Sequence, residues 1–256
     1  MLRRGLALLS VLALAACALG NGPDTRRSGF DDMGTSTQAM QRDDTQNPGM
    51  LWVQDGADLW GRRAGRSDRS CADCHGDAAR SMRGVAPRYP AFDTARGTAL
   101  TLGQRIQQCR VERQQAPAAV PESREWLALE SFVATQSRGL PIAPDRDARL
   151  ADLRQRGAAL FTQRMGQLDL SCAQCHTERA GLRLGGSVIP QGHATGYPIY
   201  RLEWQAMGSL QRRIRNCMSG VRAEPFAYGA PDMVALELYL SERARGMALE
   251  TPAVRP

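Results

Sequence analysis

The spacing of apolar residues predicts four helices that form two similar pairs. Segment 123–137 carries large apolar side chains three or four positions apart, as one face of a helix requires. These side chains are Trp126, Leu129, Phe132 and Val133. Segment 231–244 is apolar in a less regular way, and segments 102–109 and 210–217 are predicted to be shorter helices. The chain is therefore expected to be mainly helical.

These helices belong to an internal duplication, which sets the domain organisation. Gly56-Ala-Asp-Leu-Trp60 is similar to Gly157-Ala-Ala-Leu-Phe161, and Ala128-Leu-Glu-Ser-Phe132 is similar to Ala235-Leu-Glu-Leu-Tyr239. The matching segments follow one another in the same order, and a repeat of this kind marks one structural unit. Two domains are therefore predicted, and the run Pro-Ile-Ala-Pro-Asp at 141–145 indicates the linker between them.

The N-terminus has the features of a secretory signal peptide at 1–19. Two arginines precede a short apolar run that ends near small residues, and this run is too short to cross a bilayer comfortably. Leu14-Ala-Ala-Cys17 resembles a lipidation signal, so Cys17 is either a lipidated membrane anchor or is lost by cleavage near Ala18-Leu-Gly20. Either outcome predicts a protein outside the cytoplasm, in the periplasm of a cell with two membranes.

The rest of the chain is divided into three predicted parts. Residues 20–50 are polar and lack an apolar period, and we interpret them as a linker or a surface-bound N-terminal arm. Domain 1 is predicted at 51–146 and domain 2 at 147–256.

Each domain contains the pentapeptide Cys-x-x-Cys-His, as Cys71-Ala-Asp-Cys-His75 and as Cys172-Ala-Gln-Cys-His176. This is the attachment signature of c-type haem, in which both cysteines bond to the porphyrin and the histidine ligates the iron. The motif cysteines are Cys71, Cys74, Cys172 and Cys175, and the proximal iron ligands are His75 and His176. A zinc site would need a different ligand arrangement, and a redox-active cysteine pair would not need the histidine. Two covalently bound haem c groups are therefore predicted.

The order of helix, haem motif, loop, helix and helix is the layout of a class I cytochrome c. The predicted fold class is all-α, with two tandem class I cytochrome c domains that each hold one covalent haem. Aromatic residues make up only 5% of the chain, so two large apolar haems would complete cores that the side chains fill poorly.

Two cysteines outside the motifs are candidates for the sixth iron ligand. Cys109 and Cys217 occupy equivalent places in the two repeats, whereas no methionine does. We therefore predict that Cys109 and Cys217 are distal thiolate ligands, which would stabilise ferric iron and lower the reduction potential of each haem. A Cys109–Cys217 disulfide and a purely apolar role are the alternatives. His193, the one histidine outside the motifs, is predicted to be an exposed loop residue, with a place near the second haem edge as the alternative.

The formal net charge is +7, and arginine supplies this excess because the chain contains no lysine. Genomic base composition is the simplest explanation, and attraction of small anions or of an acidic partner is the functional one. Nucleic-acid binding is not expected, because the arginines are scattered and are not gathered into an aromatic-containing stripe.

The most specific segment is Arg213-Ile-Arg-Asn-Cys217-Met-Ser-Gly220, which is followed by Glu224-Pro-Phe226 and preceded by Tyr197-Pro-Ile-Tyr200-Arg201. On these residues, and over about 50–250, the chain resembles the SoxA family, the dihaem subunits of SoxAX cytochrome complexes in bacterial thiosulfate oxidation. The resemblance implies that Cys217 is both the distal ligand of the second haem and the catalytic residue, carried as a persulfide, with Arg213 beside it.

The resemblance further implies L-cysteine S-thiosulfotransferase activity, with domain 2 as the catalytic domain. Thiosulfate would be joined oxidatively to a cysteine thiol of a SoxYZ-like sulfur-carrier protein. Two electrons would leave through haem to a SoxX-like monohaem cytochrome c, the partner expected in a heterodimer.

The role of Arg213 has two interpretations. It lies one helical turn before Cys217, where it could stabilise a thiolate or persulfide or hold the oxygens of thiosulfate. A haem-propionate partner is the alternative. Arg105 stands in the same relation to Cys109, so an arginine–cysteine pair alone does not identify the reactive haem.

Three other functions compete with this interpretation. One is a thiosulfate dehydrogenase that forms tetrathionate, and another is an electron-transfer cytochrome without catalysis. A dihaem peroxidase is least favoured, because that chemistry needs an open distal position and each half here offers a cysteine.

Overall fold

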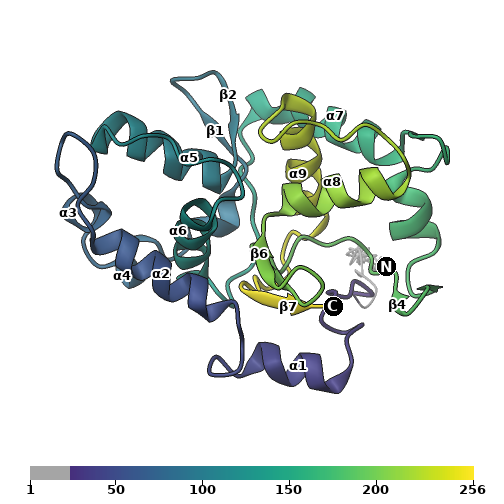
Figure 1. Cartoon of the computed structure of the whole chain (residues 1–256). Coiled ribbons are helices and arrows are strands. Elements are labelled where there is room, and N and C mark those ends of the chain that lie inside the picture. The colour runs from purple at the N-terminus through teal and green to yellow at the C-terminus, as the bar shows by residue number, and fades with distance from the viewer. Residues whose placement is uncertain (1–23) are drawn as a thin grey trace, which may run out of the picture.

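The computed structural model describes residues 24–256, so the predicted signal peptide and Cys17 lie outside the described residues. Two helical halves lie side by side, and helix α1 (Thr35–Arg42) lies below them as drawn in Figure 1. No helix within residues 24–256 is long and apolar enough to span a membrane.

The predicted helices are present in both halves. The first half contains, in order, α2 (Met50–Gly61), α3 (Cys71–His75), α4 (Ala78–Ser81), a 3₁₀ turn at Ala86–Arg88, β1 (Ala91–Asp93), β2 (Thr98–Leu100), α5 (Leu102–Cys109), a π turn at Arg110–Gln114 and α6 (Arg124–Thr135). The second half contains a 3₁₀ turn at Ala148–Leu150, α7 (Ala151–Thr162), a π turn at Gln174–Glu178, β3 (Arg183–Leu184), β4 (Ser187–Val188), β5 (Ile199–Arg201), β6 (Ala206–Gly208), α8 (Leu210–Gly220), α9 (Pro231–Arg243) and β7 (Ala253–Arg255). The helices expected from the apolar pattern are thus confirmed as α5, α6, α8 and α9.

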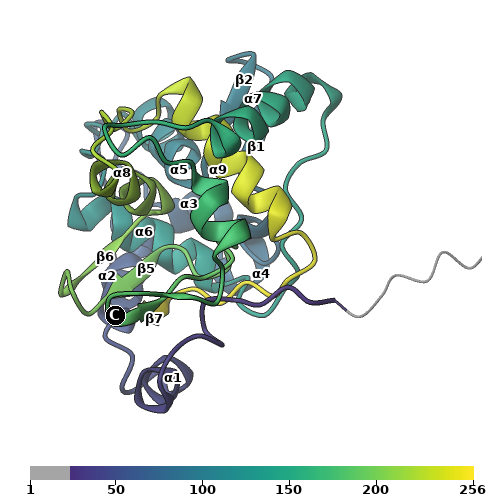
Figure 2. The same ribbon diagram turned by 90° about the vertical axis from the view of Figure 1, so that its right-hand side faces the viewer.

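The all-α prediction is wrong in one respect, because short strands accompany the helices. Within residues 24–256, β1–β2 and β3–β4 form antiparallel pairs, and a further sheet has the order β6–β5–β7 with β7 parallel to β5. Strand β7, at the C-terminus, pairs with β5 (Figure 2) and lies above α1 in both views (Figures 1 and 2). Each strand has only two or three residues, too few for an alternating pattern to be recognised in the sequence.

The first and last helices of each half cross at a glycine. A Cβ atom added at Gly56 in α2 would lie 2.2 Å from the carbonyl oxygen of Ala128 in α6. A Cβ atom added at Gly157 in α7 would lie 2.1 Å from the carbonyl oxygen of Ala235 in α9. Only glycine permits the two backbones to approach this closely, and the same crossing is present in both repeats.

An aromatic pair packs beside each crossing and begins a separate core. The ring centroids of Trp60 and Phe132 are 5.8 Å apart, and those of Phe161 and Tyr239 are 5.3 Å apart. Each pair belongs to the hydrophobic cluster of its own half. Further clusters join residues of both halves, such as Ala99 with Val234 and Leu127 with Tyr200, so the halves also share buried apolar contacts. The domain boundaries at 51–146 and 147–256 stay predictions.

The N-terminal arm lies on the surface of the second half, although it precedes the first half in the sequence. The amide of Arg27 donates to Oε1 of Gln191 (2.7 Å), and Nδ2 of Asn47 donates to the carbonyl of Pro252 (2.9 Å). Helix α1 was not expected, because its segment shows no apolar period. It packs against β7, so tertiary contact stabilises it.

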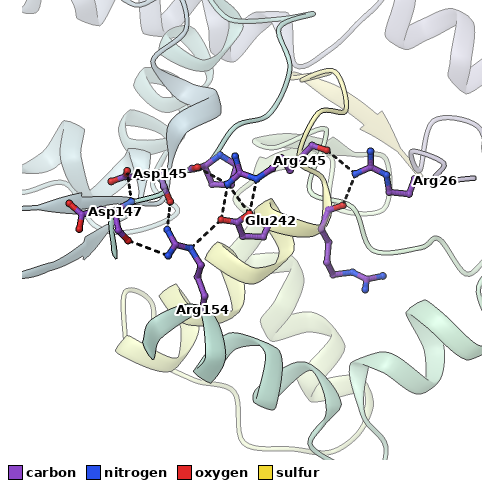
Figure 3. Close-up of polar contacts among 8 residues, drawn as sticks. Arg26, Asp145, Asp147, Arg154, Glu242 and Arg245 are labelled. Atoms are coloured by element: carbon purple, nitrogen blue, oxygen red, sulfur yellow. Dashed lines mark hydrogen bonds and ion pairs between the residues drawn. The ribbon is translucent and has the colours of Figure 1, made fainter. Parts of the chain in front are cut away.

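Arginines hold the linker between the halves in place (Figure 3). Arg154 of α7 donates to the carbonyl of Asp145 in the linker, and its Nε donates to Glu242 of α9 (3.2 Å). Glu242 also accepts from Nε of Arg245 (2.8 Å), and Arg26 of the arm donates to the carbonyl of Arg245 (2.8 Å). The arm, the linker and two helices of the second half are therefore joined in one network.

Two equivalent carboxyl groups meet between the halves. Glu130 of α6 and Glu237 of α9 line a common cavity of about 60 Å³. Nε1 of Trp126 donates to Glu130 (3.0 Å), and Nε2 of Gln211 donates to Glu237 (2.9 Å). Burial raises the pKa of Glu130 to about 8, with the charge of Glu237 adding to the shift, and burial raises the pKa of Glu237 to about 7.

Gly56→Ala is expected to destabilise the first half by about 2 kcal/mol, because the added methyl group meets a backbone atom that cannot move aside. Gly61→Ala is the matched control, since a Cβ at this other glycine of α2 meets nothing within 4 Å. Urea unfolding of the haem-loaded protein should give a lower midpoint for Gly56→Ala only. Equal midpoints for the two variants would contradict the close crossing.

The stability of the folded chain is expected to fall as the pH rises from about 5 to about 9. In the unfolded chain both carboxyl groups have a pKa near 4.5. Between this pH and the raised pKa values of the folded protein, the carboxyl groups are protonated in the folded state and ionised in the unfolded state. Glu130→Gln should flatten the dependence, whereas Glu224→Gln, which changes an exposed carboxylate, should not. Urea unfolding over a pH series checks this, and an unchanged slope for Glu130→Gln would mean that Glu130 is ionised in the folded protein.

Candidate functional site

The second haem motif is held in one orientation by its own loop. Ser171 and Gln174 cap the turn reciprocally, through amide-to-side-chain hydrogen bonds of 2.9 and 3.2 Å. Nδ1 of His176 lies 2.8 Å from the carbonyl oxygen of Pro190. A Cβ added at Gly192 would lie 3.2 Å from Cβ and Cγ of His176, so this glycine closes over the imidazole. A proton on Nδ1 satisfies the carbonyl and leaves Nε2 with the lone pair that an iron ligand requires.

Helix α8 brings the Cys217 thiol close to the imidazole of His176. Burial raises the pKa of the thiol, but the interaction with His176 and the positive charge of Arg213 outweigh it, and the net shift is downward. A lowered pKa increases the fraction of thiolate, which is the form that binds metals and acts as a nucleophile.

Positive charge is concentrated around the sulfur of Cys217. Arg213 lies one turn earlier on α8 and forms no ion pair or side-chain hydrogen bond with any residue in 24–256. Arg201, at the end of β5, also lowers the pKa of Cys217. Burial raises the pKa of Tyr197, and the charge of Arg213 opposes that shift. The phenol of Tyr197 therefore lies near Arg213 and Cys217.

The first haem site has the same parts in a more open arrangement. Cys74 and His75 are exposed, and the ring centroid of Trp60 lies 5.7 Å from that of His75. Cys109 lies at the end of α5 and interacts electrostatically with Cys71 and Cys74. Burial raises the pKa of Cys109, and no hydrogen bond with His75 opposes this shift. The two cysteines at equivalent places therefore have opposite pKa shifts.

The donor atoms fit c-type haem and do not fit a bare metal ion. The motif cysteines, Cys109 and Cys217 form no disulfides, so their sulfur atoms are available to a haem. Residues 24–256 contain no group of three or more histidine, cysteine, aspartate or glutamate side chains that could hold a metal ion by themselves. In the second half, His176 and Cys217 lie close together and offer one nitrogen and one sulfur donor.

Apolar side chains surround each motif, as a large flat group requires. In the second half Met165, Met218 and Phe226 belong to the same hydrophobic cluster as Cys172. In the first half Met82 and Tyr89 belong to the same hydrophobic cluster as Cys71.

Two interpretations made from the sequence are wrong. A Cys109–Cys217 disulfide is excluded, because both cysteines are free. His193 is half-buried and not exposed: its Nε2 lies 3.2 Å from Oε1 of Gln191, and its Nδ1 is buried without a partner among the described residues. Burial, followed by the charge of Arg243, lowers the pKa of His193 to about 4, so the imidazole is neutral at pH 7.

Three residues of the second site received no role from the sequence: Pro190, Gly192 and Arg201. Arg201 stands in the Tyr-Pro-Ile-Tyr-Arg segment, which is a recognisable signal. Its proximity to Cys217 depends on the β5–β6 hairpin that returns the chain to α8, and that hairpin was not predicted.

Known proteins share this sequence and arrangement. The family model described as SoxA/TsdA, cytochrome c domain, matches residues 55–142 and 156–249. The L-cysteine S-thiosulfotransferase subunit SoxA of Rhodovulum sulfidophilum is 35% identical over 91% of this chain and 81% of that protein. The SoxA subunit of Pseudaminobacter salicylatoxidans is 36% identical over 96% of this chain and 87% of that protein. The crystal structure of SoxXA from P. pantotrophus matches with a TM-score of 0.87 at 33% identity, over 90% of this chain and 87% of the matched chain.

Proposed function

Because this chain belongs to the SoxA/TsdA cytochrome c family, we propose that it is the SoxA-type subunit of an L-cysteine S-thiosulfotransferase, with Cys217 as the catalytic residue. One observation carries the proposal. Cys217 lies close to His176, and the interaction with His176 and the positive charges of Arg213 and Arg201 lower the pKa of its thiol against the opposing effect of burial. A partly buried sulfur with these neighbours suits chemistry in which sulfur anions react.

Haem c is the cofactor that a cytochrome c domain implies, and we assign one haem to each half. The thiols that would bond to the porphyrins are those of Cys71 and Cys74 in the first half and of Cys172 and Cys175 in the second. The axial ligands would be His75 with Cys109 and His176 with Cys217. The two complete Cys-x-x-Cys-His motifs and the imidazole of His176, which the Pro190 carbonyl holds in place, support this assignment.

The reaction follows from what the residues around Cys217 can do. When bound, the haem supplies a ferric iron that accepts electrons. Cys217 offers a sulfur atom, as a thiolate or persulfide, and the charge of Arg213 stabilises that anion. The Pro190 carbonyl holds the proton of His176 on Nδ1 and keeps the imidazole fixed. Joining a carrier thiol to thiosulfate forms one sulfur–sulfur bond, releases the thiol proton and removes two electrons.

The proposed partners follow from the same family assignment. A SoxX-like monohaem cytochrome c would form a heterodimer with this chain and receive the two electrons one at a time. A SoxYZ-like carrier and thiosulfate would be the substrates. The predicted signal peptide at 1–19 supports a periplasmic location for this reaction.

Cys217→Ala is expected to slow conjugation of thiosulfate to the carrier by about a thousandfold, because the reacting sulfur is removed. Cys109→Ala, the matched change in the first half, should keep most of the rate. Mass spectrometry of the carrier, after incubation with thiosulfate, this subunit and its monohaem partner, measures the product. Wild-type rate in Cys217→Ala would refute the catalytic assignment, and rapid tetrathionate formation without carrier would favour a thiosulfate dehydrogenase.

The mature protein is expected to carry two covalent haems, because each half has a complete attachment motif. Intact-protein mass spectrometry under denaturing conditions counts them, since thioether bonds survive unfolding. A chain in which Cys71 and Cys74 are both alanine should retain one haem. A single haem in the wild-type protein would be inconsistent with one haem per half.

A further inference from the structure

The carbonyl group that orients the second proximal histidine lies on a loop without regular secondary structure. Nδ1 of His176 lies 2.8 Å from the carbonyl oxygen of Pro190, and Gly192 lies against the imidazole ring. Residues 189–195 belong to no helix or strand. The hydrogen-bond ladder of a helix or sheet therefore does not fix this carbonyl, and contacts with other segments must fix it.

Gln191 lies between Pro190 and Gly192, and its side chain is bound to the N-terminal arm. The amide of Arg27 donates to Oε1 of Gln191 (2.7 Å), and Nε2 of Gln191 donates to the carbonyl of Thr25 (3.4 Å). The side-chain amide thus uses both its acceptor and its donor on the backbone of the arm. Arg27 and Gln191 are 164 positions apart in the chain, so this contact exists only in the folded protein.

Two arginines bind the backbone of the same loop to helix α9 and to the arm. Nη2 of Arg243, the last residue of α9, donates to the carbonyl of Gln191 (3.1 Å). Nη1 of Arg26, which extends from the arm in Figure 3, donates to the carbonyl of Arg243 (3.2 Å) and to that of Arg245 (2.8 Å). Both the side chain and the carbonyl of Gln191 are therefore held by segments outside the loop.

The first half repeats the haem motif but does not repeat this arrangement. His75 packs beside the ring of Trp60, with centroids 5.7 Å apart, and no carbonyl within residues 24–256 accepts a hydrogen bond from its ring. The hydrogen bonds that residues 25–27 make outside the arm all go to the second half. The arm therefore acts on one of the two motifs, and the other motif is an internal control.

We propose that Gln191 is a positioning residue through which the N-terminal arm holds the proximal ligand of the second haem. This role rests on the proposed function only through the assignment of His176 to haem c, and it does not depend on the sulfur reaction. The arm fixes Gln191, and Gln191 fixes the carbonyl of Pro190 that orients the imidazole. A hydrogen bond at Nδ1 makes the imidazole a more basic ligand and so stabilises ferric iron.

Gln191→Met tests this role in the haem-loaded complex with its monohaem partner. Methionine keeps the length of the side chain and loses both amide contacts with the arm. The electron paramagnetic resonance signal of the ferric second haem should shift or broaden. Its reduction equilibrium should move toward the ferrous form by at least about threefold, as expected when one hydrogen bond to the ligand is weakened. The signals and potentials of the other haems should stay unchanged, and a redox titration followed by this resonance measures all haems in one sample.

A change in the arm tests the same link from its other end. Arg27→Pro removes the backbone N–H that donates to Gln191, so it should move the second haem in the same direction as Gln191→Met. Arg27→Ala is the matched control. It keeps that N–H and loses the ion pair of the side chain with Asp32 (2.9 Å), so the second haem should be unchanged.

These measurements distinguish the positioning role from the proposed function. If Gln191→Met or Arg27→Pro leaves the signal and potential of the second haem unchanged, the positioning role is overturned, because the glutamine then only attaches the arm. An equal effect of Arg27→Ala, or an equal shift of the first haem, would also overturn it. A wild-type chain without a haem on Cys172 and Cys175 would instead refute the haem assignment. If the variants shift the second haem but the wild-type complex conjugates no thiosulfate, the sulfur reaction fails and the positioning role stands.

Discussion

The close crossing of the first and last helices is the contact on which each half depends. At Gly56 and Gly157 the two helices approach so closely that any side chain would meet a backbone carbonyl. The crossing fixes the direction in which the chain leaves the first helix of each half. It thereby places the haem motif beside the aromatic pair and near the cysteine-bearing helix, which is α5 in the first half and α8 in the second. Because both repeats have this crossing, the backbones of the two sites are alike, and their differences come from side chains.

The two sites differ most in their electrostatics. Cys217 meets His176 and two arginines, and the pKa of its thiol is lowered, whereas burial raises the pKa of Cys109. The charges at the last residues of β1 and β5 add to this difference. Asp93 neutralises Arg105 in the first half, whereas Arg201 adds a positive charge near Cys217 in the second. One duplicated backbone thus provides a more open site with balanced charge and a less exposed site with an excess of positive charge.

Contacts between segments distant in the sequence keep the second site in place. Strand β7 pairs with β5 in a register that sets Arg255 beside Arg201. The N-terminal arm and the linker are bound to the second half through the arginine network of Figure 3. The carboxyl groups of Glu130 and Glu237 meet between the halves. These long-range contacts explain how a strand of three residues can hold a charged side chain near Cys217.

The sequence by itself determined the features whose signals are local or repeated. The haem motifs are continuous patterns, the long helices have an apolar period, and Cys109 and Cys217 occupy equivalent places in a duplication. Tertiary structure alone decided the small sheets, the partial burial of His193 and the electrostatic interaction of Arg201 with Arg213. Strands of two or three residues show no period, and burial depends on neighbours from other segments. The interaction between charges depends on their separation in space, and the distance between two arginines on different elements is set only when β5 and β6 fold back onto α8.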